Sequence, residues 1–334
     1  MKTLRIPSFL AAMLACVLAF IAASPLATDP LPSWNDAAAK QAITAFVEKV
    51  TKAGSPDFVP VAERIATFDN DGTLWAEQPV IQGAFLMYRL NKLAQKDPSI
   101  RQRQPFKAAF EHDADYLKEE GMPAILELVA ATDAGMSQEE FEANVNEFFA
   151  TAKHPTLKRP FQELAYQPMV ELLRYLRANG FKTYICSGGG IDFMRVISAE
   201  LYGIPPEQVI GSSRKKDLQQ NDGRWDLART GTLNSFNDKE IKPVNIDLHI
   251  GRKPLLAGGN ERSGGDIAML RYSQSRKGPS LQLLVEHNDA DREFSYDEPD
   301  NASLNAAKES GWTVVSMKDD WKTIFPAGRS TVNR

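Results

Sequence analysis

Two aspartates at the end of a short apolar run are the residues best placed to do chemistry. Residues 65–68 are apolar or β-branched, which predicts a buried strand, and Asp69 and Asp71 follow it directly. In an open α/β sheet, ligands bind in the crevice outside the carboxyl ends of the strands, so both carboxylates are expected near a bound ligand. Aspartate, asparagine and glycine are also common turn residues, so this segment alone is equally consistent with an Asx turn.

Further polar residues follow two later predicted strands. Ser187 and three glycines come directly after the predicted strand 183–186, and Asn260 and Asp266 lie in a glycine-rich turn after the predicted strand 254–257. The Ser187 hydroxyl and backbone N–H groups such as that of Gly188, ahead of a predicted helix, are suited to hold a phosphate oxygen. A flexible turn with a helix-capping serine is the alternative interpretation of the serine and its glycines.

The order of these motifs, with a lysine near residue 240, resembles the haloacid dehalogenase superfamily. The likeness is to the phosphoserine-phosphatase-like phosphatases, and it covers about residues 60 to 290. The first motif, residues 68–73, matches the family pattern in full. The resemblance implies an α/β fold of the Rossmann-like, three-layer type, with a mostly parallel central sheet and a helical cap inserted after the first motif.

The family resemblance also implies a role for each site residue. Asp69 would be the nucleophile that forms an aspartyl-phosphate, and Asp71 would donate a proton to the leaving oxygen and later take one from water. Lys242 is the preferred lysine for neutralising the phosphoryl oxygens, with Lys239 as the alternative. Asp69 and the backbone carbonyl of Asp71 would help to bind Mg²⁺, a hard cation that offsets the repulsion between nucleophile and substrate.

The fourth motif departs from the family pattern. Many relatives have Gly-Asp followed by a second aspartate about four residues later, whereas here Asn260 is followed by residues 261–266, so the turn is longer and one charge is missing. The direct metal ligand is therefore open between Asp266, which we prefer, and Asn260. We expect Glu261 to be an exposed turn residue.

Two further residues near these motifs are weaker candidates. Glu77 lies between the first motif and the predicted cap, where it would either contact a cationic group of the substrate or be a solvated loop acid. His287 follows the predicted strand 281–285 and should lie near the same sheet edge, where we expect a structural role.

The spacing of apolar residues divides the chain into regions. Residues 79–160 lack strand-like alternation and carry apolar residues every three or four positions, and Ser137 with Glu140 forms a capping box. We therefore predict a helical cap over 79–160 whose aromatic residues form its core. The α/β core should comprise 28–78 and 161–326, with a tail over 327–334. Asn35 is the expected N-cap of a first helix over 34–52.

The N-terminus and the overall charge predict where the protein acts. Residues 1–27 combine a basic start, an apolar middle and a small-residue end, which is typical of a secretory signal peptide. We expect a secreted, periplasmic protein with no stable membrane association after cleavage; an uncleaved anchor is the alternative. Without this segment, Cys186 is the only cysteine. A net charge of −4 argues against nucleic acid as a partner.

Together these features predict a Mg²⁺-dependent phosphomonoesterase that acts on a small phosphorylated metabolite. The alternative is an exported phosphoester-binding protein of the same fold with weak or no turnover, which the asparagine at position 260 leaves open. The sequence does not determine the identity of the metabolite or the oligomeric state.

Overall fold

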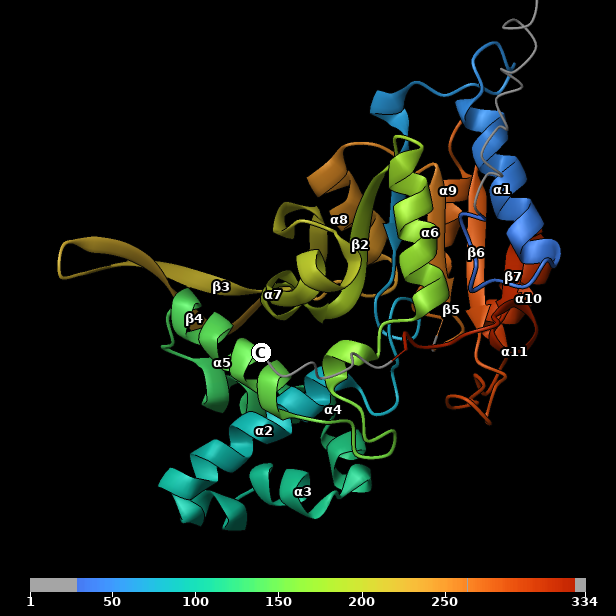
Figure 1. Ribbon diagram of the computed structural model, residues 1–334. Coiled ribbons are helices and arrows are strands. Elements are labelled where there is room, and N and C mark those ends of the chain that lie inside the picture. Colours follow the sequence, from blue (N-terminus) through green and yellow to red (C-terminus); the bar gives the residue numbers. More distant parts are fainter. Residues whose placement is uncertain (1–28, 263, 328–334) are drawn as a thin grey trace, which may run out of the picture. The chain divides into compact units, whose positions relative to one another are not determined.

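The computed structural model describes residues 29–262 and 264–327, and Figure 1 shows its elements. The predicted signal peptide and residues 328–334 of the predicted tail lie outside the described residues. Within the described part of the chain, no helix combines the length and apolar character needed to cross a membrane.

A seven-stranded sheet forms the centre of the α/β core, with the strand order β4-β3-β2-β1-β5-β6-β7. Only the pairing of β3 with β4 is antiparallel; the other neighbouring strands run parallel. The strands are β1 (Ile65–Phe68), β2 (Lys182–Gly190), β3 (Val209–Asn221), β4 (Arg224–Ser235), β5 (Leu256–Asn260), β6 (Leu281–Glu286) and β7 (Thr313–Ser316).

The strand order reverses at β1, and this reversal determines where a ligand fits. From β1 the chain builds the sheet outward through β2 and β3, and it later returns to β5 on the other side of β1. Such a switch point leaves a crevice at the carboxyl ends of the strands, because the two connections leave in opposite directions. Asp69 follows β1 directly, and its backbone N–H donates to the carbonyl of Gly258 in β5 at 2.9 Å.

Helices cover both faces of the sheet and give a three-layer arrangement. Side chains alternate along each strand, so Ile185 joins the core on one face and Cys186 joins the core on the other. The first core includes residues of α1 (Ala38–Thr51), α6 (Gln167–Ala178) and α7 (Ile191–Tyr202). The second includes residues of α8 (Ile241–Ile250), α9 (Ile267–Gln274) and α10 (Ala302–Ser310). A short helix, α11 (Met317–Asp320), follows β7.

The segment between β1 and α6 forms the helices α2 (Ile81–Lys96), α3 (Phe106–Glu111), α4 (Ala114–Asp133) and α5 (Gln138–Thr151). Leu90, Phe106 and Leu128 belong to a small core shared by α2, α3 and α4. The aromatic residues of α5 are buried, as expected, and they belong to the first core, where Phe149 packs against the ring of Phe193. The capping box of Ser137 and Glu140 is confirmed.

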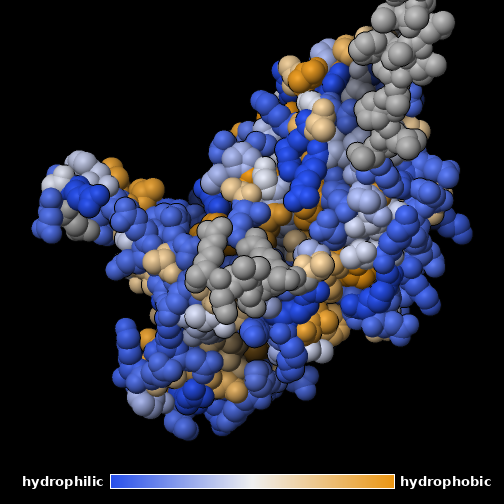
Figure 2. All heavy atoms as spheres, viewed as in Figure 1, coloured by the Kyte–Doolittle hydropathy of each residue, from blue (hydrophilic) through white to orange (hydrophobic). Residues whose placement is uncertain are grey.

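The hairpin of β3 and β4 is much longer than the sequence suggested. The sequence indicates strands only over 209–213 and 225–228, with a turn at 221–223, whereas the paired strands continue beyond these ranges and the hairpin reaches the segment between α4 and α5. There Arg229 donates its backbone N–H to Met136 and accepts from Gly135, at 2.9 and 2.8 Å. Leu218 and Trp225 are exposed on the hairpin, and Figure 2 shows a small hydrophobic patch near the projecting end of the hairpin. Hydrogen bonding between β3 and β4 stabilises this extension although its polar composition does not predict a strand.

Three local predictions were wrong. The first helix begins at Ala38 without a side-chain cap, and the side chain of Asn35 instead donates to the carbonyl of Asp319. Strand β2 continues through Gly190, and β5 through Asn260, although both glycine runs were expected to be turns. Because parallel neighbours supply the hydrogen bonds, glycine is tolerated at the end of a buried strand despite its low intrinsic preference.

Candidate active site

A polar cavity of about 350 Å³ lies at the carboxyl ends of β1, β2 and β5. It brings together every residue that the sequence singled out for the site, from segments up to 197 positions apart. These residues are Asp69, Asp71, Glu77, Ser187, Gly188, Lys242, Asn260 and Asp266. Lys239 is exposed and does not line this cavity, so Lys242 is the lysine that the fold places there.

Lys242 joins two carboxylates at the bottom of the cavity. Its Nζ donates to Asp69 Oδ1 at 2.8 Å and to Asp266 Oδ1 at 2.5 Å, and all three side chains are buried. Burial lowers the pKa of Lys242, but the carboxylates of Asp266 and Asp69 outweigh it and raise that pKa, so the ammonium keeps its charge. Burial and the nearby Asp266 raise the pKa of Asp69 well above its ordinary range.

Asp71 is held in place by a neighbouring indole and a hydroxyl. Trp75 Nε1 donates to Asp71 Oδ1 at 2.9 Å, and Ser187 Oγ lies 3.4 Å from Asp71 Oδ2. Burial raises the pKa of Asp71 to about 6, against the hydrogen bond from Trp75. A carboxyl group with a pKa near neutrality is suited to donate and accept protons.

Ser187 and the glycines after it form the wall of the cavity at the end of β2. Ser187 is buried, and its Oγ accepts the backbone N–H of Gly189 at 3.0 Å. The Ser187 oxygen therefore fixes the glycine segment, and the hydroxyl can still donate its hydrogen to Asp71 Oδ2. On β5, a Cβ at Gly259 would approach Cβ of Asp266 to 2.5 Å and its Oδ2 to 2.6 Å, so this position requires glycine.

Asn260 faces Glu77 rather than a second aspartate. Its Nδ2 donates to Glu77 Oε2 at 3.2 Å and to the Tyr296 hydroxyl at 3.3 Å, and Tyr296 donates to the same Glu77 oxygen at 2.7 Å. Arg262 pairs with the other Glu77 oxygen at 2.6 Å. The negative charge that is missing at position 260 is therefore present at Glu77.

Glu77 is not a solvated loop acid, because its side chain is buried. The segment after the first motif folds back over the cavity, and Gly72 allows this with a φ of +74°. A Cβ at Gly72 would approach Asn260 Nδ2 to 2.0 Å. The hydrogen-bond and ion-pair partners of Glu77 described above are side chains of this protein. A contact between Glu77 and a substrate stays a prediction.

Glu261 is also not exposed, contrary to the prediction. Its side chain is buried, and its Oε1 accepts the backbone N–H of His287 at 2.5 Å. Burial raises the pKa of Glu261 to about 7. Glu261 directly follows β5, and its backbone N–H donates to the carbonyl of Val285 in β6 at 3.2 Å, so the pairing of these two strands holds this residue against β6. His287 is fully buried, and its Nε2 lies 2.7 Å from the carbonyl oxygen of Gly72.

Sequence reasoning missed several residues that line or border the cavity. The missed lining residues are Gln82, Phe236, Asp238 and Arg262. Tyr296 was also missed, and its hydroxyl donates to Glu77. Arg262 could have been found from its place in the turn after Asn260. Asp238 lies in a run of charged residues typical of a surface, and nothing in the sequence places it opposite Gly188.

The donor set of this cavity suits a hard divalent cation. Among the described residues that line it, five are acidic and two, Lys242 and Arg262, are basic, so a phosphate dianion needs additional positive charge to enter. No three histidine, cysteine, aspartate or glutamate side chains in the described chain form a ready cage for a metal. Mg²⁺ commonly needs only one or two carboxylates, with carbonyl, water and phosphate oxygens completing its shell.

Comparisons with known proteins place this fold and site in a family. The family model described as haloacid dehalogenase-like hydrolase matches residues 66–257. The chain belongs to the haloacid dehalogenase-like hydrolase family. A comparison with curated proteins gives no match.

A solved structure with a TM-score above 0.5 agrees on the fold, and another resembles the chain more weakly. A conserved protein of unknown function from Anaerococcus prevotii DSM 20548 has a TM-score of 0.55 and 17% identity, over 83% of this chain and 91% of that chain. A phosphoserine phosphohydrolase-like protein from Francisella tularensis subsp. tularensis SCHU S4 has a TM-score of 0.41 and 16% identity, over 75% and 94% of the two chains. At these identities the likeness concerns the fold, an α/β fold with a mostly parallel sheet.

Proposed function

We propose that the protein is a Mg²⁺-dependent phosphomonoester hydrolase that acts on a small phosphorylated metabolite through an aspartyl-phosphate. The observation that carries this proposal is the juxtaposition of Asp69 and Asp71 in one polar cavity, with Lys242 bonded to Asp69. Asp69 forms an ion pair with Lys242, and burial raises the pKa of Asp71 to about 6. Family membership supports a hydrolase.

Each step of the reaction has a residue that serves it. A carboxylate oxygen of Asp69 attacks phosphorus, and the bond between phosphorus and the ester oxygen breaks. Asp71 passes its proton to that leaving oxygen, so the product is a neutral alcohol. Asp71 then takes a proton from the water that attacks phosphorus, and inorganic phosphate leaves while the Asp69 carboxylate is restored.

Other residues of the chain position the phosphoryl group. Lys242 orients Asp69 and offsets negative charge on the phosphoryl oxygens, and its bond to Asp266 prevents it from moving away. The Ser187 hydroxyl and the backbone at Gly188 are suited to donate to phosphoryl oxygens. Asp69, the carbonyl of Asp71, and Asp266 or Asn260 would hold Mg²⁺, which supplies charge neutralisation when bound.

The test is release of phosphate from p-nitrophenyl phosphate by the purified chain, with Mg²⁺ and after chelation. We expect turnover with Mg²⁺, loss on chelation, and recovery when Mg²⁺ returns. Asp69→Asn should lower kcat by about 10⁴-fold or more while circular dichroism stays unchanged. Absence of turnover in every condition would favour the phosphoester-binding alternative, and wild-type turnover by Asp69→Asn would contradict the nucleophile assignment.

A further inference from the structure

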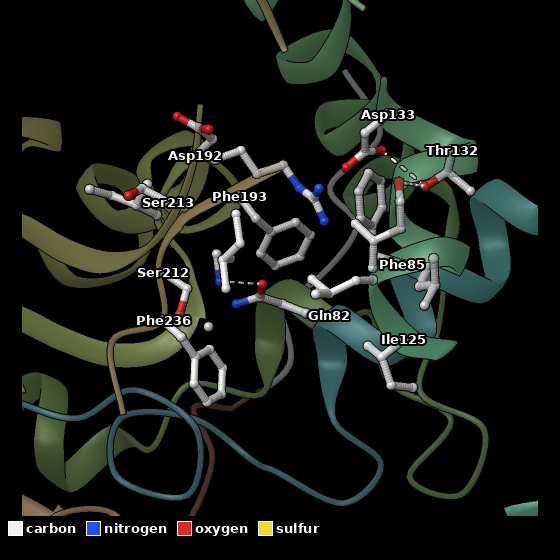
Figure 3. A pocket seen from close by; sticks show the side chains of 18 of the residues that line it. Gln82, Phe85, Ile125, Thr132, Asp133, Asp192, Phe193, Ser212, Ser213 and Phe236 are labelled. Carbon is white, nitrogen blue, oxygen red and sulfur yellow. Dashed lines mark hydrogen bonds between the residues drawn. The ribbon is translucent and has the colours of Figure 1, made fainter. Parts of the chain in front are cut away.

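A second cavity, of about 370 Å³, is lined in part by the helical segment (Figure 3). It shares five lining residues with the polar cavity: Val80, Gln82, Gly188, Gly189 and Phe236. The two cavities are therefore neighbours, and a molecule whose phosphate lies beside Asp69 would extend toward the second cavity. A volume of this size is typical of small-molecule sites.

The lining of the second cavity is mostly hydrocarbon. Phe85 of α2, Ile125 and Val129 of α4, and Phe193 of α7 all face it, and Figure 3 shows three of these around the hollow. Val80, Met122 and Phe236, which also line it, are 39%, 43% and 42% exposed. Large apolar side chains left exposed around a cavity gain free energy when an apolar ligand covers them.

The charged groups of this cavity neutralise one another. Arg229 pairs with Asp192 and lies 3.6 Å from Asp133, and its guanidinium stacks on the Phe141 ring at 3.7 Å. Arg214 is the other basic residue in the lining, so the described lining residues carry two positive and two negative side chains. A charged alcohol would disturb the pairs around Arg229, whereas an uncharged one leaves them intact, together with the hydrogen bond from Arg214 to the carbonyl of Gly231.

Gln82 marks the junction between the two cavities. Its Oε1 accepts the backbone N–H of Gly190 at 2.7 Å, which fixes the side chain against the end of β2. Its Nε2 is buried and has no hydrogen-bond partner among the described residues. An unsatisfied buried donor costs free energy, and a phosphate ester oxygen at this junction would satisfy it. In the view of Figure 3, Gln82 lies between Phe193 and Phe236.

We infer that the substrate is a phosphate monoester of an uncharged, apolar alcohol, with its phosphoryl group in the polar cavity and its hydrocarbon in the second. This inference rests on the proposed phosphatase function and narrows its substrate class. Phosphorylated amino acids, sugars and nucleotides fit poorly, because their polar groups would be buried against hydrocarbon without partners. The Gln82 amide recognises the ester at the boundary between the two parts.

The direct test is a series of n-alkyl phosphates from ethyl to octyl. The leaving oxygen has nearly the same basicity along this series, so chemistry stays constant while apolar area grows. We expect kcat/KM to rise about fourfold for each added methylene until the cavity is filled. The kcat/KM values for O-phosphoserine and glycerol phosphate should be lower than the value for butyl phosphate. A flat series with measurable hydrolysis would overturn the inference and leave the phosphatase function standing.

A pair of variants shows whether the second cavity is responsible. Val129→Phe fills it from α4 and should lower kcat/KM for octyl phosphate at least tenfold, through KM, while ethyl phosphate changes less than twofold. The matched control is Val61→Phe, at an exposed residue away from both cavities, which should change neither ester. Equal losses for both esters in Val129→Phe would indicate general damage and contradict the inference.

A binding measurement separates this inference from the proposed function. If no ester is hydrolysed, calorimetry with methylphosphonate and hexylphosphonate on the full chain still reports on the cavity. Tighter binding of hexylphosphonate by at least tenfold, lost in Val129→Phe, supports the apolar site although turnover has failed. Equal affinities for the two phosphonates overturn it.

Discussion

The two adjoining cavities differ in how the chain builds them. The polar cavity is formed mainly by residues at the ends of parallel strands, where hydrogen bonds to neighbouring strands hold the backbone rigid. The apolar cavity is formed largely by α2 and α4 and by the hairpin of β3 and β4, which meet through side chains. Under the proposed function, chemistry depends on the sheet, and choice of substrate depends on the helices and the hairpin. We therefore expect substitutions in the polar cavity to affect all esters alike, and substitutions in the apolar cavity to affect long-chain esters most.

After Asp69→Asn, the largest effect should come from Asp71. Asp71→Asn removes the proton donor and should lower kcat by about 10²- to 10⁴-fold, equally for ethyl and octyl phosphate. Because a general acid must be protonated and the pKa of Asp71 is about 6, wild-type kcat should fall about tenfold per pH unit above that value. Ionisation of the ester affects both proteins alike, so the difference between their pH profiles isolates Asp71. A loss confined to octyl phosphate would contradict the division between the cavities.

Lys242→Ala should have the next largest effect, on both activity and stability. Removal of the ammonium leaves Asp69 and Asp266 buried without their shared partner, which should cost about 3 kcal/mol in the free energy of unfolding. Turnover should fall about 10²- to 10³-fold for every ester. Urea unfolding and steady-state kinetics measure the two effects. Lys239→Ala removes an exposed lysine and should leave turnover and the free energy of unfolding unchanged. Loss of turnover in Lys239→Ala but not in Lys242→Ala would show that Lys239 is the phosphate-binding lysine.

A smaller effect is expected from Asn260→Asp, which restores the family pattern. The new carboxylate would face Glu77, whose oxygen now accepts a hydrogen bond from Asn260. Two like charges and a lost hydrogen bond should lower the free energy of unfolding by about 1–3 kcal/mol. The double variant Asn260→Asp with Glu77→Gln should recover part of this loss. If the single variant is as stable as the wild type, Glu77 does not supply the missing charge.

Residues that end strands were the most predictable part of the site. Asp69 and Asp71 could be placed because an apolar run before them indicates a strand, and parallel strands bring their ends to one edge. Ser187 and Lys242 followed from their order in a familiar pattern. Glu261 was expected to be exposed because it begins the glycine-rich turn, and nothing in its neighbours indicates that it continues the pairing of β5 with β6 and is buried. The burial of Glu77 was not predicted for a similar reason, since its partners Tyr296 and Arg262 lie far along the chain.

The apolar cavity could not be predicted from the sequence. Phe85 and Phe141 were expected to fill the core of the helical segment, and they are indeed buried, but they also line the hollow beside the polar cavity. The periodicity of a helix reveals which face is apolar and not what that face meets. The full length of the hairpin that completes the cavity was not predicted, because cross-strand pairing, rather than local composition, stabilises its extension.

The amino-acid sequence by itself determined the class of fold, the family and eight of the residues that line the polar cavity, because strand periodicity and motif order are local properties of the chain. The tertiary structure decided which lysine reaches Asp69, what faces Asn260, and that a hydrocarbon-lined hollow opens beside the acids. These features depend on contacts between segments far apart in the chain, and such contacts leave no pattern in the residues on either side.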